Sequence, residues 1–239
     1  RLLLAVSDGP TITASSSWTF FHFQQNQPAP TGDNGCFADY PTLGVDAHAL
    51  YIGVNQFCGR QFSNTSAVVV RKSSVLGSGP LVVTAFRNLI DVAGGGRGTV
   101  MFTPQGVDNP DPQATEGYFI GVDDASLGRL ILRRVSNPGG TPVLSPNLSI
   151  NVLGTAQPQT VDHRNNNNGN NGRLDALDDR LYAAQFRNGS IWTAHNIAVN
   201  NLGQGEAPRT RNAVRWYEIA GVATGNTPAL AQAGTLFTA

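Results

Sequence analysis

Residues 49–54, Ala49-Leu50-Tyr51-Ile52-Gly53-Val54, form an unbroken apolar run with the length of a buried β-strand. Two similar runs follow, residues 67–71 (Ala67-Val68-Val69-Val70-Arg71) and residues 80–86 (Pro80-Leu81-Val82-Val83-Thr84-Ala85-Phe86). Glycine, asparagine, serine and proline lie between the runs, as they do in turns between strands. This stretch therefore predicts consecutive β-strands that are joined by turns.

The same pattern extends over the rest of the chain. Further strand-like runs occupy residues 18–23, 99–102, 117–122, 129–133, 180–186, 190–194 and 213–219. The 27 glycines and 14 prolines disfavour helices, and no long segment has apolar residues at helical spacing. We expect one short helical turn, at Lys72-Ser73-Ser74-Val75-Leu76, in an otherwise all-β protein.

The runs fall into three approximate repeats, residues 1–98, 99–160 and 173–239. Each repeat has a Gly-Val-Asp or Leu-Asp element that leads into a strand, at residues 44–46, 121–123 and 174–175. Four-stranded blades with long loops produce such irregular repeats. A sandwich with the same number of strands does not explain why each repeat has such an element before a strand. We expect residues 1–239 to form a single β-propeller-type domain with roughly three to four blades.

Composition and charge point to a secreted protein. Charged residues make up 13% of the chain, compared with about 25% in typical soluble domains. The 16 basic and 16 acidic residues balance, and no basic stripe is present that could neutralise phosphates, which argues against a nucleic-acid partner. No run approaches the ~20 apolar residues of a membrane span. An extracellular or cell-surface location follows as an expectation.

The two cysteines, Cys36 and Cys58, flank a strand-like segment. They could be two free buried thiols, but the extracellular composition favours a disulfide between them. A disulfide requires their Cα atoms to lie within ~4.4–6.8 Å of each other, and a separation well beyond ~7 Å excludes it. Two cysteines without clustered histidines do not predict a zinc site.

A family resemblance is carried mainly by the first repeat. Residues 37–46 (Phe37-Ala38-Asp39-Tyr40-Pro41-Thr42-Leu43-Gly44-Val45-Asp46) and residues 51–57 resemble large bacterial secreted or cell-surface proteins with sialidase-like β-propellers. The same resemblance covers residues 18–20, 174–177, 195–196 and 215–218. It implies sialidase-like propeller blades and an extracellular setting, and it implies no particular reaction.

Both ends of the chain have strand character, at residues 1–6 and 234–239. Three repeats are too few to close a propeller, because an open blade array leaves apolar faces in water. We therefore expect an incomplete portion of a longer chain. Its open faces would be covered by further blades of the same protein or by neighbouring subunits.

Carboxylates are the first candidates for catalysis, because glycosidases use a facing pair. Asp39, beside Tyr40-Pro41 at the start of a strand, is the strongest of them, although a turn-capping role is the simpler interpretation. The other candidates are Asp46, Asp123, Asp124, Asp175 and Glu218. No nucleophile elbow is present, and the four histidines lack metal-binding spacing, so we expect neither a metal site nor a cofactor.

Aromatic residues offer a binding function. Trp192 and His195 are the candidate ligand-binding residues, since a tryptophan can stack on a sugar and a histidine near a strand end can reach a cleft; core packing is the alternative for both. Three Asn-x-Ser/Thr sequons place glycans at Asn64, Asn147 and Asn188 if the host glycosylates. Two polar loops are predicted, a glycine-rich one at residues 94–98 and an asparagine-rich one at residues 165–172.

The sequence thus favours a non-enzymatic extracellular module that binds a glycan or a protein, or takes part in surface assembly. One alternative is a glycan-active hydrolase of the sialidase or arabinanase type, which a facing carboxylate pair in a central channel would distinguish. A second alternative is a structural subunit of an extracellular filament or coat, which requires extensive self-association.

Overall fold

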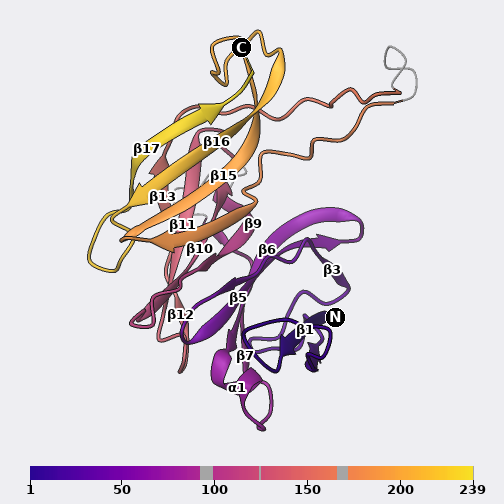
Figure 1. The fold of residues 1–239 in the computed structure, drawn as a ribbon, viewed down its shortest axis with the longest axis vertical. Coiled ribbons are helices and arrows are strands. Elements are labelled where there is room, and N and C mark those ends of the chain that lie inside the picture. Colours follow the sequence, from indigo (N-terminus) through magenta and orange to yellow (C-terminus); the bar gives the residue numbers. More distant parts are fainter. Residues whose placement is uncertain (92–98, 124, 166–171, 239) are drawn as a thin grey trace.

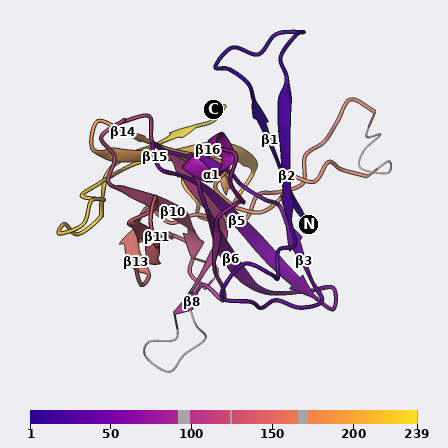
Figure 2. The same cartoon turned by 90° about the horizontal axis from the view of Figure 1, so that it is seen from below.

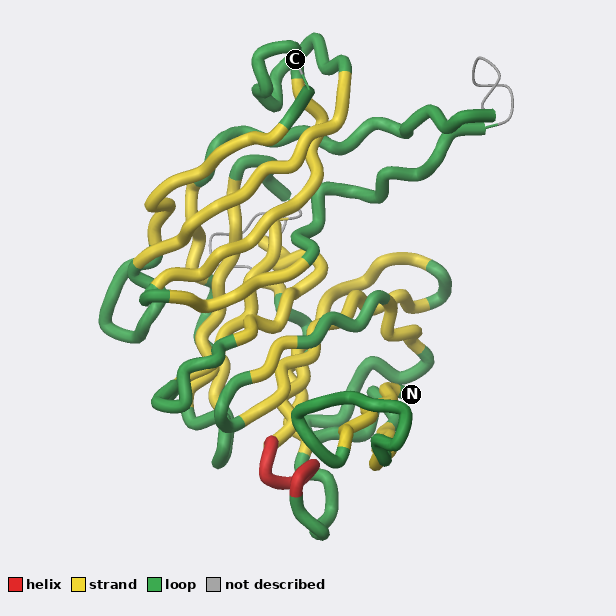
Figure 3. Tube along the Cα trace, in the orientation of Figure 1, coloured by secondary structure: helices red, strands yellow, loops and turns green. Residues whose placement is uncertain are grey.

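The protein is all-β, as the sequence predicts. A computed structural model describes residues 1–91, 99–123, 125–165 and 172–238. Strands account for 50% of the chain, and the described part contains one helix, α1 (Lys72–Leu76), which confirms the predicted helical turn. Figure 3 shows this helix at one end of a molecule built otherwise from strands and loops.

The N-terminal part forms a hairpin and a five-stranded sheet. Strands β1 (Leu2–Ser7) and β2 (Trp18–Phe23) pair with each other. The sheet has the order β3-β5-β6-β7, and β4 pairs with β5 beside β3. Its strands are β3 (Cys36–Asp39), β4 (Gly44–Val45), β5 (Ala49–Cys58), β6 (Gln61–Arg71) and β7 (Val83–Phe86).

The remaining strands form one ten-stranded sheet with two halves. The first half contains β8 (Ile90–Asp91), β9 (Thr99–Asp108), β10 (Glu116–Asp123), β11 (Arg129–Ser136), β12 (Val143–Leu144) and β13 (Leu148–Asn151). The second contains β14 (Ala183–Arg187), β15 (Ser190–Val199), β16 (Arg211–Ala220) and β17 (Ala229–Leu236). A short parallel pairing between β9 and β14 joins the halves, and the pairings within each half are antiparallel.

Three of the four hydrophobic clusters among the described residues hold these layers together, and Figure 1 shows how the layers are arranged. Alternate residues of β10 point to different cores because side chains on a strand alternate between its two faces. Phe119 packs toward the five-stranded sheet, against Tyr51, whereas Ile120 packs toward β15 and β16. The third core lies under the β1–β2 hairpin and α1 and includes Leu2, Ile52, Val68 and Val75.

A glycine permits the closest approach between the first two layers. A Cβ atom on Gly53 of β5 would lie 1.9 Å from the carbonyl oxygen of Pro104 in β9. Nearby, the Thr42 hydroxyl donates to the same carbonyl at 2.6 Å, and the Val45 amide donates to Asp108 at 2.9 Å. The start of the five-stranded sheet is therefore fixed directly to β9.

The residue ranges of the three predicted repeats contain strands β1–β8, β9–β13 and β14–β17, and we refer to these as the three groups. The expectation of separate four-stranded blades in a propeller is not met, because the described residues form sheets of two, ten and five strands and no propeller is detected. The physical reason is the pairing of β9 with β14, which merges the second and third groups into one sheet.

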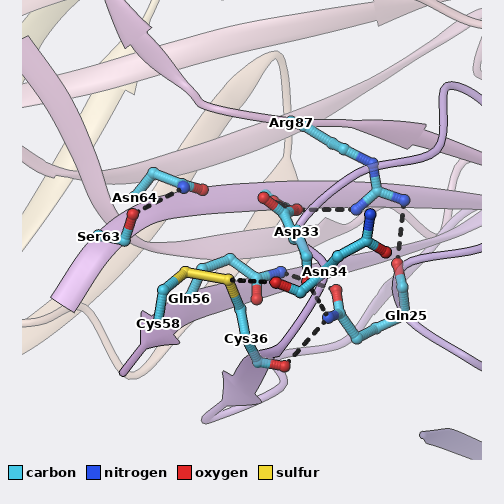
Figure 4. Close-up of a disulfide and its surroundings, with 10 residues drawn as sticks. Gln25, Asp33, Asn34, Cys36, Gln56, Cys58, Ser63, Asn64 and Arg87 are labelled. Carbon is cyan, nitrogen blue, oxygen red and sulfur yellow. Dashed lines mark hydrogen bonds and ion pairs between the residues drawn. A yellow bond between two sulfur atoms is a disulfide. The ribbon is translucent and has the colours of Figure 1, made fainter. Parts of the chain in front are cut away.

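The predicted disulfide is present. Cys36 and Cys58 are bonded, and their Cα atoms lie 4.2 Å apart, just below the usual range of ~4.4–6.8 Å, because the two residues are directly opposite each other on β3 and β5. Figure 4 shows the surrounding loop held by polar contacts, with Gln25 donating to the carbonyl of Cys36 at 3.2 Å. An ion pair of 2.7 Å between Arg87 and Asp33 fastens the same loop to the end of β7.

Candidate functional site

The outer face of the β14–β17 half carries a pair of tryptophans, of which Trp192 is exposed and Trp216 is half-buried. On β15, Ile191 faces the core and Trp192 faces away from it, with 36% of its surface exposed. Trp216 of β16 lies on the same face, and the two indole rings are 5.9 Å apart and inclined by 22°. Gly234 of β17 is opposite Trp216, where a Cβ atom would lie 2.5 Å from the indole nitrogen. The missing side chain lets the indole lie flat against the sheet.

Polar side chains border this tryptophan pair. Glu218 is directly opposite Trp192 on β16 and accepts a 2.7 Å hydrogen bond from Gln232 of β17. On the other side, Gln185 of β14 is opposite Trp192 and exposed. Strand alternation places Arg187 on this face as well, because Phe186 packs into the core. The face thus combines apolar rings with hydrogen-bonding groups and one charge of each sign among these residues.

A groove continues the same face beyond Trp216. It has a volume of about 500 Å³ and is lined by Asn196, Asn212, Ala213, Val214, Leu236, Phe237 and Thr238. The Asn196 amide donates from Nδ2 to the carbonyl of Ala176 at 2.7 Å. Its Oδ1 is buried and has no hydrogen-bond partner among the described residues. Asn196 therefore ties β15 to the loop that contains Ala176.

The second predicted ligand-binding residue, His195, lies in the interior. Only 1% of its surface is exposed, and both ring nitrogens are engaged, by the carbonyl of Asp179 and by the Tyr217 hydroxyl at 3.0 Å. Burial lowers the pKa of His195 from 6.5 to about 4, and the nearby Arg215 guanidinium acts in the same direction. His195 is therefore a neutral packing residue beneath the sheet, on the face opposite to Trp192.

A smaller pocket, which we call the convergence pocket, lies where the β3–β4 connection, β9 and the start of β14 meet. It has a volume of about 260 Å³ and is lined by Tyr40, Pro41, Thr42, Leu43, Gln105, Asp108, Tyr182, Ala183 and Ala184. Asp39, the catalytic candidate, is next to Tyr40 in the chain and half-buried, but it does not line the pocket. Among the described lining residues Asp108 is the one carboxylate, and it accepts the Val45 amide at 2.9 Å.

Arg180 forms a rigid support behind this pocket. Its guanidinium makes two 2.6 Å bonds to Asp178 and lies 4.3 Å from the centre of the Tyr40 ring. The hydrogen bonds to Asp178 raise the pKa of Arg180, to which the charge of Asp39 also contributes. Tyr40 has a positive φ of 51°, a conformation that non-glycine residues rarely adopt. The pocket wall is therefore held in place by contacts within the protein.

The other candidate carboxylates mostly have structural roles. Asp46 is buried and accepts the amides of His48 at 2.7 Å and Ala49 at 2.8 Å. Asp123 is buried and forms a 2.5 Å ion pair with Arg129. Asp175 accepts an amide two residues later at 2.8 Å, as expected for an aspartate in a turn. Asp124 lies outside the described residues.

The three sequons differ in accessibility. Asn188 is exposed in the tight turn between β14 and β15. Asn147 accepts a 2.6 Å hydrogen bond from Arg133, and Asn64 lies within β6 with its Oδ1 buried. A glycan fits without rearrangement at Asn188. At Asn147 and Asn64 the asparagine side chain must first move out of its present contacts.

Two further observations concern metal sites and membranes. Within the described ranges, no three histidine, cysteine, aspartate or glutamate side chains are grouped so that they could hold a metal ion. No helix in that same part of the chain has the length and apolar character needed to cross a membrane. The predicted loops at residues 94–98 and 165–172 fall outside the described residues, except for their ends at Asn165 and Gly172.

Sequence reasoning considered both Trp192 and Trp216 as residues that could stack on sugars, but it did not predict Gln185, Asn196 or Gln232 as ligand-binding residues. The available signal was the alternation along β15 and β16, where Trp192, Asn196 and Trp216 occupy one face while Ile191 and Tyr217 occupy the other. Comparison of the chain with family models, curated proteins and solved structures gave no match. The resemblance to sialidase-like propeller proteins therefore stays a prediction.

Proposed function

We propose that this protein is an extracellular, non-enzymatic module that binds glycans on the face carrying Trp192 and Trp216. The observation that carries the proposal is the near-parallel pair of indoles on an exposed sheet face. A sugar ring has an apolar C–H face that packs on an indole, and its hydroxyl groups need polar partners at the edge. Gln185, Glu218 and Gln232 supply such partners around the rings.

The convergence pocket supports binding in preference to hydrolysis. Glycoside hydrolysis uses two carboxyl groups on either side of the scissile bond, about 5 to 9.5 Å apart. Among the described residues lining this pocket, Asp108 is the single carboxylate, and one of its oxygens already accepts the Val45 amide. The Cys36–Cys58 disulfide is consistent with an extracellular location, since disulfides persist in oxidising compartments.

The propeller-type architecture remains part of this proposal. The three groups of antiparallel strands follow one another in the chain, and one strand of each lies beside the next: β4 contacts β9, and β9 pairs with β14. In a propeller, blades are arranged around a central channel, so strands of successive blades lie near one another there. The proposal is that the groups are sialidase-like blades with strands that meet at the convergence pocket, and a crystal structure of the protein tests it.

The glycan proposal is tested with the three tryptophans of the chain. Trp192→Ala and Trp216→Ala remove the aromatic pair, and Trp18→Ala, on the β1–β2 hairpin, is the matched control. Affinity electrophoresis in gels that contain hydroxyethylcellulose, xylan or glycol chitin measures binding. We expect retardation of the wild type in at least one gel, a loss of about tenfold or more in affinity for each of the first two variants, and an unchanged control.

Two results contradict the proposal. One is a wild-type protein that none of the three polysaccharides retards. The other is an equal loss of affinity in all three tryptophan variants, which would place the effect on general stability. Circular dichroism melting curves of each variant separate folding from binding.

Surface assembly is a second candidate function, and the β1–β2 hairpin favours it. Figure 2 shows the hairpin extending away from the body of the molecule. Its outer face exposes 75% of Leu3 and 77% of Phe20, together with part of Trp18. Exposed apolar patches of this kind mark protein interaction sites.

A further inference from the structure

We propose that the convergence pocket binds an organic cation, namely the primary ammonium group of an alkylamine such as a lysine side chain. The volume of about 260 Å³ can hold the end of one such chain. The residues that line this pocket are not those of the tryptophan face, so the proposal is independent of the glycan function.

The first argument is a buried amide whose oxygen a ligand can reach. Gln105 of β9 lines the pocket, and only 3% of its surface is exposed. Its Nε2 donates to the carbonyl of Thr103 at 3.1 Å, which fixes the orientation of the amide because a carbonyl can only accept. The Oε1 atom has no hydrogen-bond partner among the described residues, but it keeps access to solvent, unlike the enclosed Oε1 of Gln56. Because so little of Gln105 is exposed, the pocket that it lines is where a hydrogen-bond donor reaches this oxygen.

The second argument is a carboxylate that lines the same pocket. One oxygen of Asp108 accepts the Val45 amide at 2.9 Å. The other oxygen makes no hydrogen bond or ion pair in the part of the chain that the structure describes, and Asp108 is exposed. Asp108 therefore supplies a negative charge that attracts a cation bound at Gln105.

The third argument is the balance of charge around the pocket. Neither lysine nor arginine occurs among its described lining residues. Behind the pocket wall, the Arg180 guanidinium is held by two bonds to Asp178, and the charge of Asp39 also acts on it. With Asp108, three carboxylates surround one guanidinium, so a bound cation meets a net negative charge whereas an anion is repelled.

Two tyrosine rings complete the pocket. Tyr40 and Tyr182 both line it, and the face of an aromatic ring attracts a cation. The guanidinium of Arg180 lies 4.3 Å from the centre of the Tyr40 ring, so this wall already has a cation on it, and Tyr182 is 47% exposed and open to a second one. The pocket thus combines a free acceptor, a carboxylate and an aromatic ring, which together match the three N–H donors and the charge of an ammonium group.

The site is tested by NMR titration, in which backbone amide shifts of the protein report where a ligand binds. The probes are n-butylammonium, its neutral analogue n-butanol, methyl glucoside, and an acetylated and amidated Ala-Lys-Ala tripeptide. The two cationic probes distinguish the sources of an ammonium group, since one is a free amine and the other presents a lysine side chain of a peptide.

Three variants accompany the titration. Asp108→Asn removes the charge and keeps an acceptor for the Val45 amide, and Gln105→Met removes Oε1 at nearly constant size. Since Asp108 is at the surface, its variant is informative even if Gln105→Met fails to fold. Asp8→Asn is the matched control, because Asp8 is also exposed and also accepts one backbone amide, from Ser17 at 3.1 Å, but lies on the β1–β2 hairpin.

We expect n-butylammonium to shift amides within residues 40–43 and 105–108, and to bind at least about tenfold more tightly than n-butanol. Asp108→Asn should weaken this binding by about tenfold, and Gln105→Met by about threefold or more, because each removes one interaction with the ammonium group. Asp8→Asn should bind as the wild type does. Tripeptide binding at the same amides identifies a protein side chain as a ligand, and binding of n-butylammonium alone identifies a free amine.

Four outcomes overturn the inference. Equal affinity for n-butanol and n-butylammonium rejects recognition of the charge. Unchanged affinity in Asp108→Asn and in folded Gln105→Met rejects the assigned residues. Shifts of these amides by methyl glucoside but not by n-butylammonium identify a sugar site instead. Absence of shifts with both cationic probes rejects the site, and none of these results bears on glycan binding at the tryptophan face.

Discussion

His195 shows at the residue scale how burial sets a charge state. The ring is enclosed by Tyr217, by the carbonyl of Asp179 and by the side chain of Arg215, a cation that opposes a second positive charge. The pKa is lowered to about 4 in the folded protein from 6.5 in the exposed group, so the unfolded chain binds the proton more tightly. The stability that the neutral ring contributes is therefore complete above pH 6.5 and is lost as the pH falls toward 4.

This gives a measurable pH dependence. We expect the free energy of unfolding to decrease by on the order of 3 kcal/mol between pH 7 and pH 4 on account of His195. Urea denaturation across this pH range measures the free energy of unfolding. A His195→Gln variant has no titrating ring, so its free energy of unfolding should decrease less than that of the wild type, by the amount assigned to His195. Identical pH profiles for the wild type and the variant would be evidence against a buried neutral histidine.

Part of the local geometry at the residue scale could be predicted. Trp192 is exposed beside polar side chains, which the proposed stacking role requires, and Asp46 and Asp175 accept backbone amides as aspartates in turns do. The interior position of His195 agrees with the core alternative. The role of Asn196 was not predictable, because its orientation depends on the carbonyl of Ala176, which belongs to a loop twenty residues earlier in the chain.

At the scale of the elements, the contact between β5 and β9 depends on a glycine. Ala in place of Gly53 would put a methyl group 1.9 Å from the Pro104 carbonyl oxygen, so one strand must move. We expect Gly53→Ala to lower the free energy of unfolding by about 2 kcal/mol or more. Gly154→Ala is the control, since a Cβ atom there meets nothing within 4 Å.

Urea denaturation measures both glycine variants. Equal stability of Gly53→Ala and the wild type would mean that the two layers are not in the close contact described. The sequence shows the glycine but not the contact that requires it. A glycine within a strand signals the close approach of another backbone segment without identifying that segment.

At the scale of the whole molecule, large apolar side chains of the described residues are exposed on two different sheet faces. One is the tryptophan face, and the other is the outer face of the β1–β2 hairpin, with Leu3 and Phe20. We expect the hairpin to mediate self-association, so that Leu3→Ser with Phe20→Ser lowers the molar mass in light scattering at high protein concentration. Trp192→Ala should leave this association unchanged, and a wild type that is monomeric at every concentration would reject the prediction.

The sequence by itself determined the all-β class, the short helix and the disulfide. These features depend on local alternation, on turn residues and on neighbouring segments, all of which can be read along the chain. Only the tertiary structure decided that β9 pairs with β14, that Gly53 meets Pro104, and that Trp192 and Trp216 share an open face with Asn196. Alternation assigns residues to two faces of a strand, but which face is covered depends on long-range packing between distant segments.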